Sequence, residues 1–377
     1  MSDKRVALVL SGGGARAAYQ VGVLQALAEF LPGLELHILT GVSAGAINAV
    51  YLAAKRADWS DRVDGLAQLW SNIRVDRVVR SDSFTLLGQA TRWFFRLSSG
   101  GLGVHGPKAL LDTQPLHQFL EEHLEVRDGA ISNIDYNLNN TPLQSVAITG
   151  SNYAYGRSVT WIQSREDVHV EAWQRAHRVG CQAKLHLSHV MASSAIPLVF
   201  PAIHVDGGWY GDGGLRLSAP LSPAVHLGAE KILAIGTRTH AAAMQPEKDG
   251  AYPPPAQIVG SVLDVLFNDH FDSDLLRLER INSLIRHEPD HVSNSLRKVQ
   301  AYVIRPSVDL GSWASEHEAE LPHAIRFLSR GLGTENVRSN GLLSLLLFEP
   351  NYVRRLIDLG YQDCRSHWTE LQIFLAS

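Results

Sequence analysis

Hydrophobic and polar residues alternate with two different periods over the first 60 positions of the chain. The continuous apolar run Val6–Leu10 has the length of a buried strand, and apolar positions then recur at helical spacing across residues 21–31. The short apolar run 36–39 precedes Ala44–Ala54, a stretch of small apolar residues that is typical of a buried helix. Two successive strand–turn–helix units predict parallel strands joined by right-handed crossovers. We therefore expect an α/β fold with a doubly wound, mostly parallel sheet, helices on both faces, and functional groups at the carboxyl ends of the strands.

The remainder of the chain predicts further elements of the same kind. Thr113 as a cap and Pro115 in the first turn predict a helix that continues through Leu124. Strand-like runs occur at residues 145–149, 158–162, 231–236 and 299–304. The first two runs flank a segment rich in turn residues, which indicates a hairpin, and the last predicts a strand that joins the sheet late in the chain.

The length of the chain leaves its division into domains open. Its 377 residues exceed the roughly 250 to 300 residues at which one core stops growing, so one large domain or two domains both fit. Residues 241–257 are loosely patterned, contain three consecutive prolines and are the best candidate for a linker or loop. We therefore predict a first domain at 1–240, which carries the motifs below, and a mostly helical C-terminal region at 258–377, whose packing on that domain is left open.

Composition and charge exclude several classes of protein. Hydrophobic residues make up 45% and charged residues 19% of the chain, which indicates a globular protein rather than a disordered one. The 34 basic and 38 acidic residues give a net charge of −4, so no nucleic-acid partner is expected. Cys181 and Cys364 are the two cysteines, and they suggest neither a disulfide framework nor a metal-ligand cluster. We expect a reducing compartment and no metal.

Targeting and membrane-spanning segments are not expected either. The N-terminal residues run directly into the first predicted strand and lack the length and the cleavage site of a signal peptide. The richest apolar run, 342–348, is far shorter than the roughly 18 residues that a membrane-spanning helix needs. We expect a cytoplasmic protein with at most peripheral contact with a membrane, and the sequence does not indicate its oligomeric state.

A glycine-rich turn at residues 12–17 stands between the first predicted strand and helix. Gly12, Gly13 and Gly14 allow a close approach of the backbone and direct free N–H groups outward at a helix N-terminus, which makes a site for negative charge. Arg16 opposes the helix dipole there, which indicates a bound anion unless the side chain is simply solvated. The turn also fits a dinucleotide-binding pattern, but the acidic residue that this pattern expects after the second strand is replaced by Thr40-Gly41.

A second motif, Gly41-Val42-Ser43-Ala44-Gly45, again separates a predicted strand from a predicted helix. In a G-x-S-x-G elbow the turn is so sharp that the serine adopts a strained backbone conformation, and glycines flank it because side chains would clash. The alternative is an ordinary serine that caps the helix. The strand before it and the small-residue helix after it favour Ser43 as a nucleophile.

A third motif repeats Asp-Gly-Gly at Asp206 and Asp212. Repeated Asp-Gly steps are typical of tight turns, so a hairpin with solvated carboxylates is one interpretation. A serine nucleophile, however, needs a base. His226 and His240 follow Asp212 and could complete a Ser-Asp-His triad, but no histidine stands in a recognisable motif, and a Ser-Asp dyad is the simpler hypothesis.

The three motifs, in this order, resemble those of the patatin-like phospholipases, and residues 192–201 also resemble a segment of that family. The resemblance implies that Gly12, Gly13 and Gly14 supply the oxyanion hole, that Ser43 is the nucleophile, and that Asp212 is the base without histidine. It covers approximately residues 6–235 and implies the patatin-like α/β fold.

The chain departs from the family pattern at two positions. Ala17 replaces a glycine after the basic residue, and Ser218 replaces an asparagine after the second Asp-Gly-Gly. Both substitutions bear on substrate preference more than on the chemistry.

The resemblance implies a serine lipid acyl hydrolase of the phospholipase A type. It would cleave acyl esters of phospholipids or related lipids through an acyl-enzyme, without any cofactor. Arg16 is the predicted substrate contact because a cation at this helix start indicates an anion to hold. A thioesterase or general carboxylesterase with the same dyad is one alternative, and a non-catalytic lipid-binding regulatory protein is another. Intact Ser43 and Asp212 argue against the non-catalytic alternative.

An aromatic segment follows the elbow helix in the irregular middle of the chain. Trp93 and Phe94 are flanked by arginines, a composition that fits a segment lying at a membrane surface, and residues 98–103 after them are rich in glycine. Aromatic clusters more often belong to the core. The sequence therefore leaves a core segment and an interfacial flap as two open interpretations.

Overall fold

The computed structural model of the chain describes residues 4–81, 109–239, 271–287, 296–331 and 341–376, with single positions at 88, 91, 258, 261 and 262. The linker predicted at 241–257 lies outside these residues, as do Trp93, Phe94 and His240.

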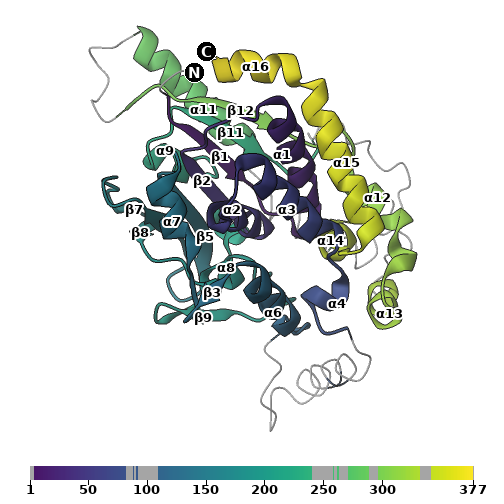
Figure 1. The fold of residues 1–377 in the computed structure, drawn as a ribbon. Coiled ribbons are helices and arrows are strands. Elements are labelled where there is room, and N and C mark those ends of the chain that lie inside the picture. Colours follow the sequence, from purple (N-terminus) through teal and green to yellow (C-terminus); the bar gives the residue numbers. More distant parts are fainter. Residues whose placement is uncertain are drawn as a thin grey trace.

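A mixed, mostly parallel sheet runs through the centre of the molecule (Figure 1). Its strands are β1 (Val6–Leu10), β2 (Ile38–Val42), β5 (Ser145–Asn152), β6 (Arg157–Ser164), β7 (Trp173–Arg175), β8 (Arg178–Gln182), β9 (Ile203–Val205), β10 (Gly208–Asp212), β11 (Lys231–Ile235) and β12 (Gln300–Ile304). The order along the sheet is β12-β11-β1-β2-β5-β6-β8-β7. The strands from β12 to β5 are parallel, whereas β6 and β10 both pair antiparallel with β5. A separate small hairpin joins β3 (Val126–Arg127) to β4 (Ala130–Ile131).

Helices surround this sheet (Figure 1). They are α1 (Ala18–Phe30), α2 (Ala44–Ala54), α3 (Trp59–Ser71), α4 (Val75–Val78), α6 (Gln114–His123), α7 (Asn133–Asn140), α8 (Leu187–Ser193), α9 (Ser222–His226), α11 (Phe271–His287), α12 (Leu310–Glu316), α13 (His323–Gly331), α14 (Gly341–Leu346), α15 (Pro350–Ser366) and α16 (Trp368–Ala376). Short 3-10 helices are η1 (Gly14–Ala17), η2 (Gly213–Arg216) and η5 (Glu318–Glu320). No helix of the described residues is long and apolar enough to cross a membrane.

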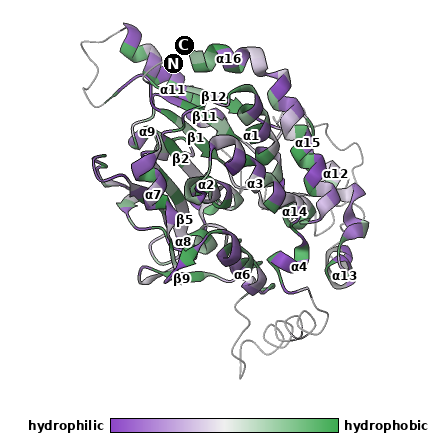
Figure 2. Ribbon diagram, viewed as in Figure 1, coloured by the Kyte–Doolittle hydropathy of each residue, from purple (hydrophilic) through white to green (hydrophobic). Residues whose placement is uncertain are grey.

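The apolar runs of the sequence are continuous because both faces of the sheet are buried. Leu8 and Leu10 of β1 belong to the core cluster that includes residues of α1, α2, α3 and α15, whereas Ala7 and Val9 belong to a second cluster with residues of α9 and α11. A strand buried on both faces reads as a hydrophobic run rather than as an alternation. Figure 2 shows the resulting concentration of hydrophobic residues on the central strands.

The fold class predicted from the sequence is confirmed, including the hairpin, which is β5 and β6. The second strand begins at Ile38 and extends through Thr40 and Gly41 to the residue before Ser43. The first helix begins with the 3-10 turn η1. The helix predicted from Thr113 is α6, although the Thr113 side chain makes no capping hydrogen bond.

Two described elements after residue 296, β12 and α15, pack on the sheet and on α1. β12 pairs in parallel with β11 at one edge, and α15 crosses α1 so closely that glycines are needed on both helices. A Cβ at Gly22 would lie 1.8 Å from the Ile357 carbonyl oxygen, and one at Gly360 would lie 2.0 Å from the Tyr19 carbonyl oxygen. Any side chain at these positions would separate the two helices.

Candidate active site

Ser43 lies at a sharp turn between β2 and α2. Its backbone angles are φ 55° and ψ −133°, a conformation that non-glycine residues rarely adopt, and its side chain makes no capping hydrogen bond to α2. Both features argue against an ordinary helix cap, whose residue normally has extended angles and a bonded side chain. The strained turn is the geometry expected of a nucleophile elbow.

The two glycines of the elbow allow this turn to form. A Cβ at Gly45 would lie 2.4 Å from the carbonyl oxygens of Leu10 and Ser11, and a Cβ at Gly41 would lie 2.3 Å from the Gly45 carbonyl oxygen. The start of α2 therefore rests directly on the end of β1. This contact explains the spacing of the motif and brings Ser43 beside the glycine-rich turn that follows β1.

The register of three strands brings Asp212 to Ser43. Val42, the last residue of β2, pairs with Thr149 of β5, and the next residue of β5, Gly150, pairs with Asp212 of β10. A Cβ at Gly213 would lie 2.6 Å from Val42 Cγ2, so the chain after Asp212 also packs against the end of β2. Sequence reasoning selected both residues, and the sheet brings them together.

Asp212 is fully buried and only partly satisfied by hydrogen bonds. Its Oδ1 accepts a hydrogen bond of 2.8 Å from the Gly214 N–H, whereas its Oδ2 has no hydrogen-bond partner among the described residues. Burial raises the pKa of Asp212 to about 7, and the nearby Ser43 hydroxyl and the Gly214 N–H partly oppose this rise. A carboxylate that lies near a serine, has a pKa near neutral and keeps one oxygen without a hydrogen bond is suited to accept that serine's proton.

The glycine-rich turn runs directly against Ser43. A Cβ at Gly12 would lie 2.9 Å from Ser43 Cβ, and the Gly12 carbonyl oxygen accepts a hydrogen bond of 2.5 Å from Thr237 Oγ1. The N–H groups of Gly12 and Gly13 donate to no residue in the described part of the chain. Backbone N–H groups left free beside a nucleophile are the arrangement that an oxyanion hole requires.

Arg16 has partners that the sequence did not predict. Its side chain is buried, with Nε donating to Ser344 Oγ at 2.7 Å and a terminal nitrogen donating to the Gly341 carbonyl oxygen at 2.9 Å. Arg16 is therefore not a solvated surface residue, and its hydrogen bonds attach the glycine-rich turn to α14. It does not line the cavity beside Ser43, so its role as a substrate contact stays a prediction.

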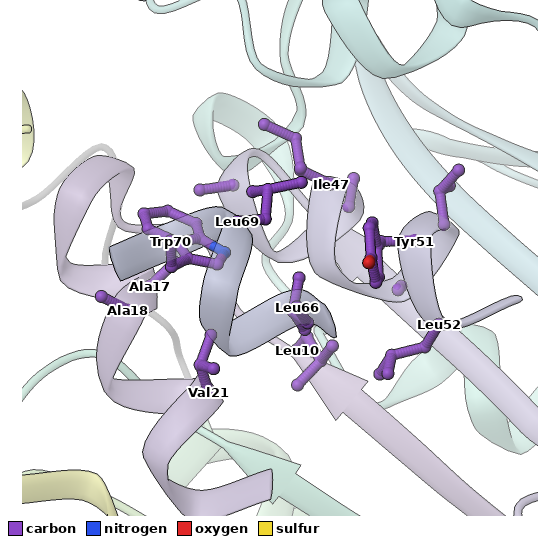
Figure 3. Packing of buried hydrophobic residues seen from close by; sticks show 14 of the residues in the cluster. Leu10, Ala17, Ala18, Val21, Ile47, Tyr51, Leu52, Leu66, Leu69 and Trp70 are labelled. Atoms are coloured by element: carbon purple, nitrogen blue, oxygen red, sulfur yellow. The ribbon is translucent and has the colours of Figure 1, made fainter. Parts of the chain in front are cut away.

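A small apolar cavity of about 30 Å³ lies beside Ser43. Its lining comes mostly from α2, α3, α4, α6 and the segment after α8, with contributions from η1 and from the residues between α14 and α15. It consists of Gly14, Ser43, Ala44, Ile47, Leu69, Trp70, Ile73, Val78, Leu116, Phe119, Leu120, Ser194, Ile196, Phe200 and Phe348. Figure 3 shows how Ile47, Leu69 and Trp70 belong to the packed layer formed by α1, α2 and α3. The apolar lining matches the chemistry of a hydrocarbon group.

The end of α8 and the residues after it hold the backbone of Ser43 and of Asp212, a role that the sequence did not reveal. Ser193 Oγ accepts a hydrogen bond of 3.0 Å from the Ser43 N–H and donates one of 2.7 Å to the Thr149 carbonyl oxygen. The Ala195 carbonyl oxygen accepts a hydrogen bond of 2.8 Å from the Asp212 N–H. The only signal in the sequence was the resemblance of residues 192–201 to a family segment, which carried no assignment to individual residues.

A series of hydrogen bonds between buried polar side chains behind the site was also not predicted from the sequence. Gln20 Nε2 donates to the Ser11 carbonyl oxygen at 2.8 Å, Asn48 Nδ2 donates to Gln20 Oε1 at 2.9 Å, and Trp70 Nε1 donates to Asn48 Oδ1 at 2.7 Å. These bonds connect α1, α2 and α3 to the end of β1. Isolated polar residues in apolar helices are the one sequence feature that could have indicated them.

Two further candidates, His226 and Asp206, contact other residues than Ser43. His226 stacks on Trp173, which belongs to the core cluster on the face opposite α2, and burial lowers the pKa of this histidine. Asp206 lies in the turn between β9 and β10 with φ 50°, and its carboxylate lies 3.0 Å from Nε2 of the buried His189. The first Asp-Gly-Gly is therefore a turn, as the sequence indicated. No group of residues suited to bind a metal occurs in the described ranges.

The fold and the site define a doubly wound α/β protein with a strained serine beside a buried carboxylate. A sequence model of the patatin-like phospholipases matches residues 8–225, which is more than half of the chain, and the protein belongs to this family. Comparison with curated protein sequences gave no match.

Several solved structures match this chain at low sequence identity. VipD from Legionella pneumophila is 14% identical with a TM-score of 0.34, and the match covers 95% of this chain and 67% of VipD. Human GIVD cytosolic phospholipase A2, in complex with methyl gamma-linolenyl fluorophosphonate, is 13% identical with a TM-score of 0.48 over 99% of this chain and 59% of that chain. The type III effector protein ExoU of Pseudomonas aeruginosa is 14% identical with a TM-score of 0.36 over 97% of this chain and 53% of ExoU. The chain thus spans between half and two thirds of the length of these proteins.

Proposed function

We propose that the protein is a serine hydrolase that cleaves acyl esters of phospholipids or related lipids, with Ser43 as the nucleophile and Asp212 as the base. Membership of the patatin-like phospholipase family supports the reaction class. The strained Ser43 and the buried Asp212 beside it support the dyad. The single observation that carries the proposal is the apolar cavity beside Ser43. Its lining suits an acyl chain better than a small polar ester.

The first half of the reaction forms an acyl-enzyme. Asp212 Oδ2 takes the proton of the Ser43 hydroxyl as Oγ attacks the ester carbonyl carbon, and the N–H groups of the glycine-rich turn stabilise the resulting oxyanion. The tetrahedral intermediate then breaks the bond to the alcohol, which leaves with the proton from Asp212.

The second half releases the fatty acid. Asp212 takes a proton from water, the hydroxide attacks the acyl carbonyl, and the proton passes to Ser43 Oγ as the acyl group departs. The same carboxylate therefore acts as base and acid in both halves. No metal or other cofactor is needed for these steps.

The proposal is tested by hydrolysis of phospholipid vesicles and of a soluble short-chain ester by wild type and Ser43→Ala. We expect fatty-acid release by wild type and a loss of at least about a thousandfold in Ser43→Ala, since the nucleophile is gone. The melting temperature should stay close to that of wild type because the substitution removes only the hydroxyl. Full turnover by the variant would contradict the proposal. Cleavage of the soluble ester or of a thioester, but not of phospholipid, would favour the alternative carboxylesterase or thioesterase.

A further inference from the structure

Ser194 follows α8 and stands between the two residues that hold the dyad. The preceding residue, Ser193, accepts the N–H of Ser43, and the following residue, Ala195, accepts the N–H of Asp212. The Ser194 backbone is itself fixed, because its N–H donates to the Val190 carbonyl oxygen at 3.1 Å. The backbone of Ser194 is thus held close to Ser43 and Asp212.

The Ser194 hydroxyl is buried without a hydrogen-bond partner. The residue is 6% exposed, and Ser194 Oγ bonds to no residue that the structure describes. It lines the same cavity as Ser43, whose other lining residues are apolar apart from Ser43 itself and the backbone of Gly14. A buried hydroxyl with no partner costs free energy in the folded protein, and most such groups in native structures have one.

The chemistry of an acyl ester limits what this hydroxyl can bond. A hydrocarbon chain in the cavity offers no acceptor, so the acceptor must belong to the ester group, which reaches Ser43 when the chain is bound. The carbonyl oxygen of that group is directed to the N–H groups of Gly12 and Gly13 in the proposed mechanism. The acceptor left for the Ser194 hydroxyl is the bridging oxygen between the acyl group and the alcohol.

We infer that Ser194 is a substrate-binding residue whose hydroxyl donates a hydrogen bond to the bridging oxygen of the ester. The inference rests on the proposed function and narrows it, because it makes the site selective for oxygen esters over thioesters. Sulfur is a weak hydrogen-bond acceptor, and a site built to bond a substrate oxygen discriminates against an analogue that lacks it.

The test compares kcat/KM for an oxygen ester and for the thioester of the same acyl chain in wild type and Ser194→Ala. We expect the variant to lose about tenfold to a hundredfold on the oxygen ester, the cost of one unmade buried hydrogen bond, and to change much less on the thioester. The melting temperature should be unchanged or raised, since an unpaired hydroxyl is removed. Ser194→Cys, which keeps the size but donates weakly, should show the same change of selectivity.

Thr40 provides a matched control. Its Oγ1 is also buried without a partner among the described residues, but Thr40 does not line the cavity. Thr40→Val should therefore leave the ratio of the two kcat/KM values unchanged.

Equal losses on both substrates, no loss on either, or a lowered melting temperature in Ser194→Ala would overturn the inference. Ser43→Ala in the same assay keeps the two claims apart. If Ser43→Ala is inactive while Ser194→Ala equals wild type, only the role of Ser194 fails. If Ser43→Ala retains turnover, the proposed function fails as well.

Discussion

At the scale of single residues, the burial of Asp212 determines the pH range in which the proposed dyad would work. The carboxylate is fully buried, and its raised pKa of about 7 means that it is protonated in the folded protein at mildly acidic pH. In the unfolded chain an aspartate ionises near its ordinary value of 3.8. Folding therefore opposes ionisation of Asp212, and its effect on stability is most unfavourable above pH 7.

Two consequences follow for Asp212. We expect kcat/KM to rise as the pH increases through about 7, because only the ionised carboxylate accepts the Ser43 proton.

Asp212→Asn should remove most of the activity and yet stabilise the fold. The gain in free energy of unfolding should be roughly 2 to 3 kcal/mol larger at pH 8 than at pH 5. Denaturant unfolding at the two pH values measures this difference.

Two variants serve as controls for Asp212→Asn. His226→Ala should retain activity, because the ring stacks on Trp173 on the opposite face of the sheet. Asp206→Asn should also retain most of the activity, since its carboxylate contacts His189 rather than Ser43. A stability gain for Asp212→Asn that is equal at both pH values, or a collapse of activity in His226→Ala, would contradict the assigned base.

At the scale of elements, contacts with α14 hold the glycine-rich turn in position. Arg16 donates hydrogen bonds to Ser344 and Gly341 of α14. Gly14, with φ 54°, lies against the carbonyl oxygen of Leu345 in the same helix. A C-terminal element thereby determines the position of the backbone N–H groups in the proposed oxyanion hole. The turn and α14 are more than 300 residues apart in the sequence, so no local pattern could predict this contact.

Gly14→Ala tests the contact. Its Cβ would lie 2.2 Å from the Leu345 carbonyl oxygen, and the positive φ disfavours alanine, so the turn must shift. Losing one oxyanion donor costs about 10² to 10³ in kcat, and we expect a loss of this order with KM little changed. Steady-state kinetics on a soluble ester measures both constants.

Gly33→Ala is the matched control for Gly14→Ala. A Cβ at Gly33 would meet nothing within 4 Å, so this variant should behave as wild type. Wild-type kcat in Gly14→Ala would show that the turn does not position the oxyanion donors.

At the scale of the whole molecule, the parts that were predictable are those encoded locally. The strand–turn–helix units, the elbow at Ser43 and the second Asp-Gly-Gly are short patterns whose geometry follows from glycine positions and from the apolar period. The bonds of Ser193 and the cavity lining depend on contacts between distant segments. The boundary predicted at 241–257 stays a prediction, whereas β12 and α15 show that later segments complete the sheet and cover α1.

The central claim is that Ser43 is a nucleophile activated within this fold. The most direct measurement is reaction of the folded protein with a lipid-like fluorophosphonate, followed by mass spectrometry of the intact chain and of its peptides. The proposed dyad predicts one adduct per chain, located on Ser43, absent from Ser43→Ala and formed much more slowly in Asp212→Asn. An unmodified wild-type protein, or an adduct that persists in Ser43→Ala, would contradict it.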